Sequence, residues 1–107
     1  MTDEQATALM RFLTKGFASE AWDTDLVDNW DIYERMCYRI DKDGSAGLKA
    51  YLDEQVDQEK PYDDIGIRLG IYTKIKNILY GDISLVPPLM EQFPGLCKWR
   101  LSLEESP

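Results

Sequence analysis

Three oxygen-bearing side chains near the middle of the chain have the spacing of a metal-binding loop. Asp41, Asp43 and Ser45 lie at alternate positions, as do the first ligands of a helix–loop–helix calcium site. The rest of that pattern is absent when Asp41 is taken as the first ligand. The sixth position, normally glycine, is Ala46, and the twelfth, normally a bidentate glutamate, is Leu52. The calcium pattern is therefore incomplete.

The same segment is explained equally well by a turn between two helices. Gly44 permits the positive φ that leaving a helix requires, and Ser45 is a suitable N-cap for the next helix. Treating Ala46 as an insertion brings Gly47 and Asp53 nearer to the calcium register, but aspartate is a shorter ligand than glutamate. We predict a turn, with no metal site and no cofactor.

Catalytic groups are scarce elsewhere in the sequence. The chain has no histidine, which removes the most common general base and zinc ligand. Cys37 and Cys97 are expected to be buried thiols, and no histidine is present to activate either one. Neighbouring carboxylates such as Asp63 and Asp64 belong to faces with a solvated pattern. We predict no catalytic residue and no enzyme.

Composition limits the class of protein and of partner. The 107 residues predict one domain, 1–107, and a hydrophobic fraction of 44% is sufficient for one core. The net charge is −8, from twenty acids and twelve bases. Nucleic acid and anionic membranes need a basic surface, so we expect neither as a partner. The amino terminus lacks the pattern of a secretory signal, and we expect a cytoplasmic protein with a basic protein partner.

Apolar residues recur at intervals of three and four, which predicts an all-α fold. We expect a bundle of four main helices, approximately Thr2–Ala18, Thr24–Ile40, Ser45–Gln58 and Tyr62–Tyr80. A short helix should begin at Pro87 or Pro88 and end before Pro94. Beyond it, alternate apolar residues from Cys97 to Leu103 predict an extended tail or a second short helix laid across the bundle.

Local signals place the ends and faces of these helices. Thr2 and Gln5 have the spacing of a capping box, and Gly81 is a suitable residue to end the fourth helix. In the second helix, five residues spaced four, three, four and three apart should form one buried seam: Leu26, Trp30, Tyr33, Cys37 and Ile40.

Acidic residues gather in two stretches, and both contain an aromatic residue outside the regular seams. Residues 20–34 hold six acids and no base, and residues 53–64 hold six acids and one lysine. In an antiparallel bundle these stretches would share one end of the molecule. Aromatic residues among acids are typical of interface anchors. We predict that the following residues bind the partner: Trp22, Asp23, Asp25, Asp28, Asp31, Asp53, Glu54, Asp57, Glu59, Tyr62, Asp63 and Asp64.

In size, charge and helicity the chain resembles the bacterial immunity proteins that neutralise colicin or contact-dependent-inhibition toxins. That resemblance implies a small acidic protein that covers the basic active site of a nuclease toxin. No motif supports it, so no residue is carried over. A phage-encoded inhibitor of a host nucleic-acid enzyme has the same general properties.

A helical adaptor is the alternative from a different class. Its apolar groove would hold a partner helix between the fourth helix and the proline-rich segment "LVPPLMEQFPGL". Salt separates the two hypotheses, because electrostatic steering weakens with ionic strength whereas binding in an apolar groove does not.

Overall fold

The structure is a computed structural model, and it describes residues 1–15, 23–58 and 70–105. Every regular element within these ranges is helical, which confirms the all-α prediction for them. The finer prediction of a four-helix bundle stays a prediction. The elements are α1 (Asp3–Lys15), α2 (Asp23–Gln58), α3 (Ile71–Tyr80), the 3-10 turns η3 (Ile83–Leu85) and η4 (Pro87–Leu89), and α4 (Pro94–Glu105).

The predicted capping box begins α1. The Thr2 amide donates to Gln5 Oε1 at 2.9 Å, and the Gln5 amide donates to Thr2 Oγ1 at 3.0 Å. Each side chain therefore satisfies a backbone donor of the first turn that has no partner within the helix. Apolar residues at intervals of three and four give α1 its inward face, on which Ala6, Leu9 and Leu13 are buried.

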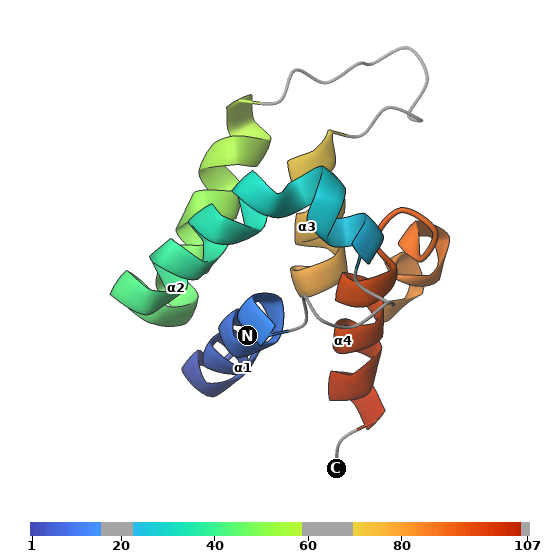
Figure 1. Ribbon diagram of the computed structural model, residues 1–107, viewed down its shortest axis with the longest axis horizontal. Helices are drawn as coiled ribbons and strands as arrows, with labels where there is room; N and C mark the ends of the chain where they lie inside the picture. Colours follow the sequence, from blue (N-terminus) through green and yellow to red (C-terminus); the bar gives the residue numbers. More distant parts are fainter. Residues whose placement is uncertain (16–22, 59–69, 106–107) are drawn as a thin grey trace.

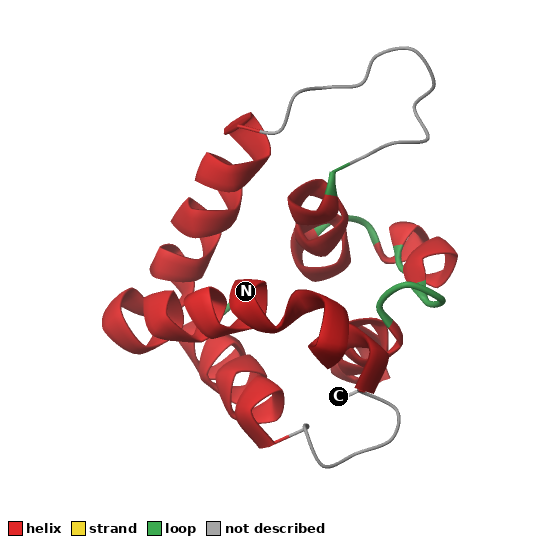
Figure 2. Ribbon diagram, turned by 45° about the horizontal axis from the view of Figure 1, so that its top comes forward, coloured by secondary structure: helices red, strands yellow, loops and turns green. Residues whose placement is uncertain are grey.

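A sharp corner at Gly44 divides α2 into two arms. Gly44 has φ 68° and ψ −149°, a conformation that costs glycine little and other residues considerably more. The predicted turn is therefore confirmed, although the preceding helix continues past Ile40 as far as the corner. We call residues 23–43 the first arm and residues 45–58 the second arm. The arms diverge from the corner as a V (Figures 1 and 2).

The amino-terminal segment forms hydrogen bonds with the residue that follows the corner. Asp3 Oδ1 accepts a hydrogen bond from the Ser45 amide at 3.0 Å, and Ser45 Oγ donates to the Met1 carbonyl at 2.6 Å. The second arm is thus capped by a carboxylate from α1, and the prediction that Ser45 caps its own helix is wrong. A helix N-terminus favours a negative charge of this kind.

Contacts between side chains join the two arms close to the corner. Arg39 Nη2 lies 3.6 Å from Glu54 Oε2, and the Arg39 guanidinium lies 5.4 Å from the centre of the Tyr51 ring. The Tyr51 hydroxyl then lies 3.2 Å from that of Tyr72 in α3. These contacts connect the first arm, the second arm and α3.

One apolar core lies where α1, both arms of α2, α3 and α4 meet. Its largest fully buried side chains come from all of these elements and from the segment after α3. They are Leu9, Tyr33, Met36, Leu48, Leu52, Ile75, Ile78, Val86, Leu96 and Cys97.

The third α-helix is shorter than the sequence pattern predicts. It begins at Ile71 after Gly70, which has the extended values φ −64° and ψ 162°. The predicted start at Tyr62 lies outside the described residues. At the other end Gly81 is the C-cap, and its amide donates to the Asn77 carbonyl at 3.0 Å. The predicted end of this helix is therefore confirmed.

The carboxyl-terminal region agrees with prediction in part. The short helix expected to begin at Pro87 or Pro88 is only the 3-10 turn η4, and of the two forms expected for the tail the helix is the one found, as α4, which begins at Pro94. Proline suits the first turn of a helix, where a backbone donor is not needed. Arg100 Nη1 in α4 donates to the Ile78 carbonyl at 2.8 Å, and the Trp99 ring stacks on Phe12 at 6.4 Å. The α4 helix is thus fixed to α3 and α1.

Candidate functional site

Many of the predicted partner-binding residues lie outside the part of the chain that the structure describes. Five are in the omitted ranges: Trp22, Glu59, Tyr62, Asp63 and Asp64. Asp23, Asp25 and Asp28 belong to the first turns of α2, but their side chains are also outside the described part. The prediction can therefore be followed in space only at Asp31, Asp53, Glu54 and Asp57.

Two of these four acids have cationic partners within the chain. The Asp53 carboxylate lies 2.6 Å from Lys76 Nζ and 2.9 Å from Lys49 Nζ. Hydrogen bonds from Lys76 and then Lys49 lower the pKa of Asp53. Glu54 pairs with Arg39 across the two arms. Both carboxylates hold helices together in this structure.

The other two acids face solvent. Asp31 lies on the first arm and Asp57 on the second, both are exposed, and neither forms an ion pair with a described residue. The V shape of α2 separates the beginning of the first arm from the end of the second (Figure 1).

An irregularity at Asn29 changes which residues of the first arm face outward. Asn29 has φ −127° and ψ 16°, outside the helical range. The apolar seam is therefore not continuous through this point: Asn29 is only 3% exposed, whereas Trp30 is 47% exposed. The prediction that Trp30 lies in the buried seam is wrong. Tyr33 and Ile40 are buried as predicted, and Met36 is buried between them. Cys37 is only partly buried, and the side chain of Leu26 lies outside the described part.

The outer side of the first arm combines acids with exposed aromatic rings. Trp30, Glu34, Tyr38 and Asp41 follow one another at helical spacing, and Asp31 lies beside Trp30. We call these five residues the acidic aromatic face. Tyr38 is 61% exposed, and all three acids are exposed.

The cations of the same arm point mainly elsewhere. Hydrogen bonding to Tyr51 and then Tyr72 raises the pKa of Arg35, which places its guanidinium on the side of the second arm and α3. Arg39 is held by Glu54 and Tyr51. Lys42 is the exception, with its ammonium 5.7 Å from the centre of the Tyr38 ring.

The three acids of the face therefore keep most of their charge uncompensated. Asp31, Glu34 and Asp41 form no ion pair with any residue that the structure describes. With Arg35 and Arg39 directed toward the second arm, Lys42 is the cation placed at the face itself. The first arm thus presents a negative surface, because its own arginines are engaged on the other side.

A small apolar pocket opens beside the acidic aromatic face. Its volume is about 230 Å³, and its lining comprises Thr14, Trp30, Tyr33, Glu34 and Cys37. One carboxylate and one indole thus border an apolar cavity. A lysine or arginine side chain has the matching form, because its stem is apolar and its head is cationic.

The thiol in this pocket is unsuited to nucleophilic chemistry. Burial, and secondly the nearby Glu34 carboxylate, raise the pKa of Cys37 to about 11. The thiol is therefore protonated near neutral pH, whereas a nucleophilic cysteine acts as the thiolate. Its hydrogen is directed at the Met10 carbonyl, 3.9 Å from the sulfur. Cys37 contributes apolar surface to the pocket.

The described residues form neither a metal site nor a membrane-spanning helix. Within residues 1–15, 23–58 and 70–105, no group of acids and cysteines is arranged to hold a metal ion. None of the helices described there has the length and hydropathy to cross a membrane. No protein-family model matches the chain, and no curated protein or solved structure matches it either.

Sequence reasoning missed most of the acidic aromatic face. Of its five residues only Asp31 was among those predicted to bind a partner. The sequence does contain a signal for this face, because Trp30, Glu34, Tyr38 and Asp41 are four, four and three residues apart. That spacing is as regular as the seam to which Trp30 was assigned, so it gave no reason to prefer one face.

Proposed function

We propose that the protein binds a basic protein partner through the acidic aromatic face and inhibits that partner by covering its active site. The class of partner that fits best is a nuclease toxin, for which this chain would act as the immunity protein. The observation that carries the proposal is that Asp31, Glu34 and Asp41 have no ion-pair partner among the described residues and lie around the exposed Trp30 and Tyr38 rings.

Each component of the face contributes a different property to binding. Carboxylates without internal partners accelerate encounter with a positive surface and select against anionic partners. Large exposed aromatic rings supply the apolar area on which affinity depends. The pocket beside Trp30 and Glu34 accepts the stem of a lysine or arginine, whose head group would then lie near the carboxylate.

The chemistry of a nuclease substrate supports the choice of a nuclease as the partner. An enzyme that binds phosphates needs a positively charged site, and a negative protein surface competes for that site. Inhibition then requires only that the surface cover the site. None of the groups on the acidic aromatic face needs to perform chemistry.

The test compares two variants with the same change in net charge. Asp31→Asn/Glu34→Gln removes two acids from the face, and Glu4→Gln/Asp57→Asn removes two exposed acids elsewhere. Proteins retained from a lysate of the native host are identified for the wild type and both variants. We expect one basic protein to be retained by the wild type and the control but lost from the face variant.

Salt dependence and inhibition complete the test with that purified protein. The association rate should fall as ionic strength rises, and the wild type should inhibit any nuclease activity that the partner has. Equal retention of the same proteins by both variants would contradict the proposed surface. Binding without inhibition would contradict the inhibitory role and leave the surface intact.

A further inference from the structure

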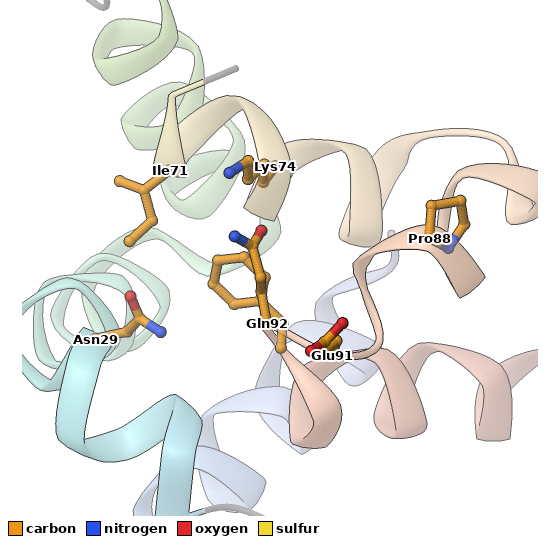
Figure 3. A pocket seen from close by; sticks show the side chains of 7 residues that line it. Asn29, Ile71, Lys74, Pro88, Glu91 and Gln92 are labelled. Atoms are coloured by element: carbon orange, nitrogen blue, oxygen red, sulfur yellow. The ribbon is translucent and has the colours of Figure 1, made fainter. Parts of the chain in front are cut away.

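A second pocket lies on another side of the molecule, between the Asn29 irregularity, the start of α3 and the segment before α4. Its volume is about 670 Å³, within the range of small-molecule sites. Four of its residues carry polar side chains of three kinds: the carboxamides of Asn29 and Gln92, the ammonium of Lys74 and the carboxylate of Glu91. Figure 3 shows that they come from three separate segments around the pocket.

Asn29 provides the strongest indication of a ligand. Its side chain is almost completely buried, and Oδ1 has no hydrogen-bond partner among the described residues. In Figure 3 the carboxamide turns from α2 toward the space between Ile71 and Gln92. A buried polar group without a partner is costly to the folded state. A ligand donor placed in the pocket would remove that cost.

The two charged groups of the pocket also have no ion-pair partner among the described residues. Neither Lys74 nor Glu91 forms an ion pair within the described part of the chain, although Lys49, Lys76, Arg39 and Arg100 all do. Lys74 lies in the first turn of α3, a helix whose N-cap makes no side-chain hydrogen bond. The positive end of the helix and the ammonium therefore favour an anion at the same place.

The remaining lining is apolar. Ile71, Pro88 and Phe93 form this part of the wall, and Phe93 is itself buried in the core. A ligand that fills the pocket therefore needs an apolar portion as well as its charged groups. This mixture does not suit a partner helix, because such a helix would place an apolar face against Lys74, Glu91 and two carboxamides.

We propose that this pocket binds a small zwitterion with an apolar side chain, of the class of the apolar α-amino acids. The ligand carboxylate lies at Lys74 and the start of α3, and its ammonium lies toward Glu91 and Asn29 Oδ1. Its side chain lies on Ile71, Pro88 and Phe93. The ligand has no net charge, so it enters a protein of net charge −8 without the repulsion that a simple anion meets.

Calorimetric titration and thermal melting of the full chain test the pocket, with L-leucine and L-phenylalanine as probes. Two analogues of leucine each lack one charge: 4-methylpentanoate has no ammonium, and 3-methylbutylamine has no carboxylate. We expect both amino acids to bind and to raise the melting temperature by mass action. We expect the affinity of each analogue to be lower than that of leucine by about tenfold or by a larger factor, because one charged contact is lost. Absence of binding by both amino acids would overturn the proposal, as would equal binding of the analogues.

Variants separate binding from folding. Asn29→Leu replaces the unpartnered amide with an apolar group of similar size, so it should abolish binding while the melting temperature stays the same or rises. Lys74→Met should weaken binding about tenfold. Its control is Lys98→Met, which removes an exposed lysine outside the pocket and should leave binding unchanged. Undiminished binding by both Asn29→Leu and Lys74→Met would refute the assignment.

Discussion

The first arm of α2 holds seven acids and the second arm holds three, and the two arms use their acids differently. In the second arm, Asp53 and Glu54 are paired with lysine or arginine side chains. In the first arm, Asp31, Glu34 and Asp41 have no such partners among the described residues, and two large aromatic rings lie exposed among them. The second arm therefore uses two of its three acids to hold helices together, and the first arm keeps charge available at the surface.

The difference arises from where the cations are placed. Lys49 precedes Asp53 by one helical turn, and Lys76 reaches the same carboxylate from α3. Arg35 and Arg39 belong to the first arm, yet both are directed to groups on the second arm or α3. The net charge counted along the sequence thus overestimates the free negative charge of the second arm and underestimates that of the first arm.

The largest expected effect comes from breaking the corner that joins the arms. A Cβ added to Gly47 would lie 2.5 Å from the Arg39 carbonyl oxygen and 2.8 Å from Asp43 Cβ. Because one of these contacts is with backbone, we expect Gly47→Ala to lower the free energy of unfolding by about 3 kcal/mol. Chemical denaturation measures the loss. Ala46→Ser, an exposed change at the same corner, is the control, and equal stability of the two variants would contradict the tight packing.

The next effect concerns the partner rather than the fold. Trp30→Ala should weaken partner binding by about 2 kcal/mol, because large aromatic anchors dominate interface energies. Isothermal titration with the purified partner measures it. Ile83→Ala removes another exposed apolar side chain, 38% exposed and away from the face, and should leave affinity unchanged. If both variants bind as the wild type does, Trp30 is not an anchor.

A smaller effect tests the connection between α1 and the second arm. Asp3→Ala removes the carboxylate that accepts from the Ser45 amide, and loss of an N-cap costs about 1 kcal/mol. Glu4→Ala removes an equal charge from the same turn of α1 and serves as the control. Thermal unfolding should separate the two variants, and equal melting temperatures would show that the cap contributes nothing.

The smallest expected effect is a pH dependence of the protein's stability that arises from Asp53 in the second arm. The lysine contacts lower the pKa of Asp53 in the folded state, so its stabilising contribution is present above the pKa of the unfolded chain. That contribution is lost as the pH falls through the lowered folded-state value. Asp53→Asn should therefore be less stable than the wild type at neutral pH, and the difference should disappear in acid. Denaturation curves across this range measure it, and a difference independent of pH would contradict the assignment.

Local sequence signals predicted much of the fold. The capping box at Thr2 and Gln5, the corner at Gly44 and the helix end at Gly81 each depend on a few adjacent residues, and each is confirmed. Helical periodicity also accounts for the buried face of α1, with Ala6, Leu9 and Leu13. These features need no knowledge of distant residues.

Features that depend on distant contacts were not predictable in the same way. The cap on the second arm comes from Asp3, forty-two residues before Ser45. The Asn29 irregularity has no sequence signal that separates it from a regular helix, and it moves Trp30 to the surface. The directions taken by the Arg35 and Arg39 side chains depend on the V shape of α2. The structure was therefore needed to identify which acids have a cationic partner.

The contrast between Trp30 and Trp99 gives the molecule two internal optical reporters. Trp30 is half exposed on the first arm, whereas Trp99 is 8% exposed and stacked on Phe12 in the core. With Trp22 replaced by phenylalanine, the red-shifted part of the emission would follow events at the surface of the first arm. The blue-shifted part would respond only when the core itself opens, so docking and denaturation can be followed in one cuvette without an added dye.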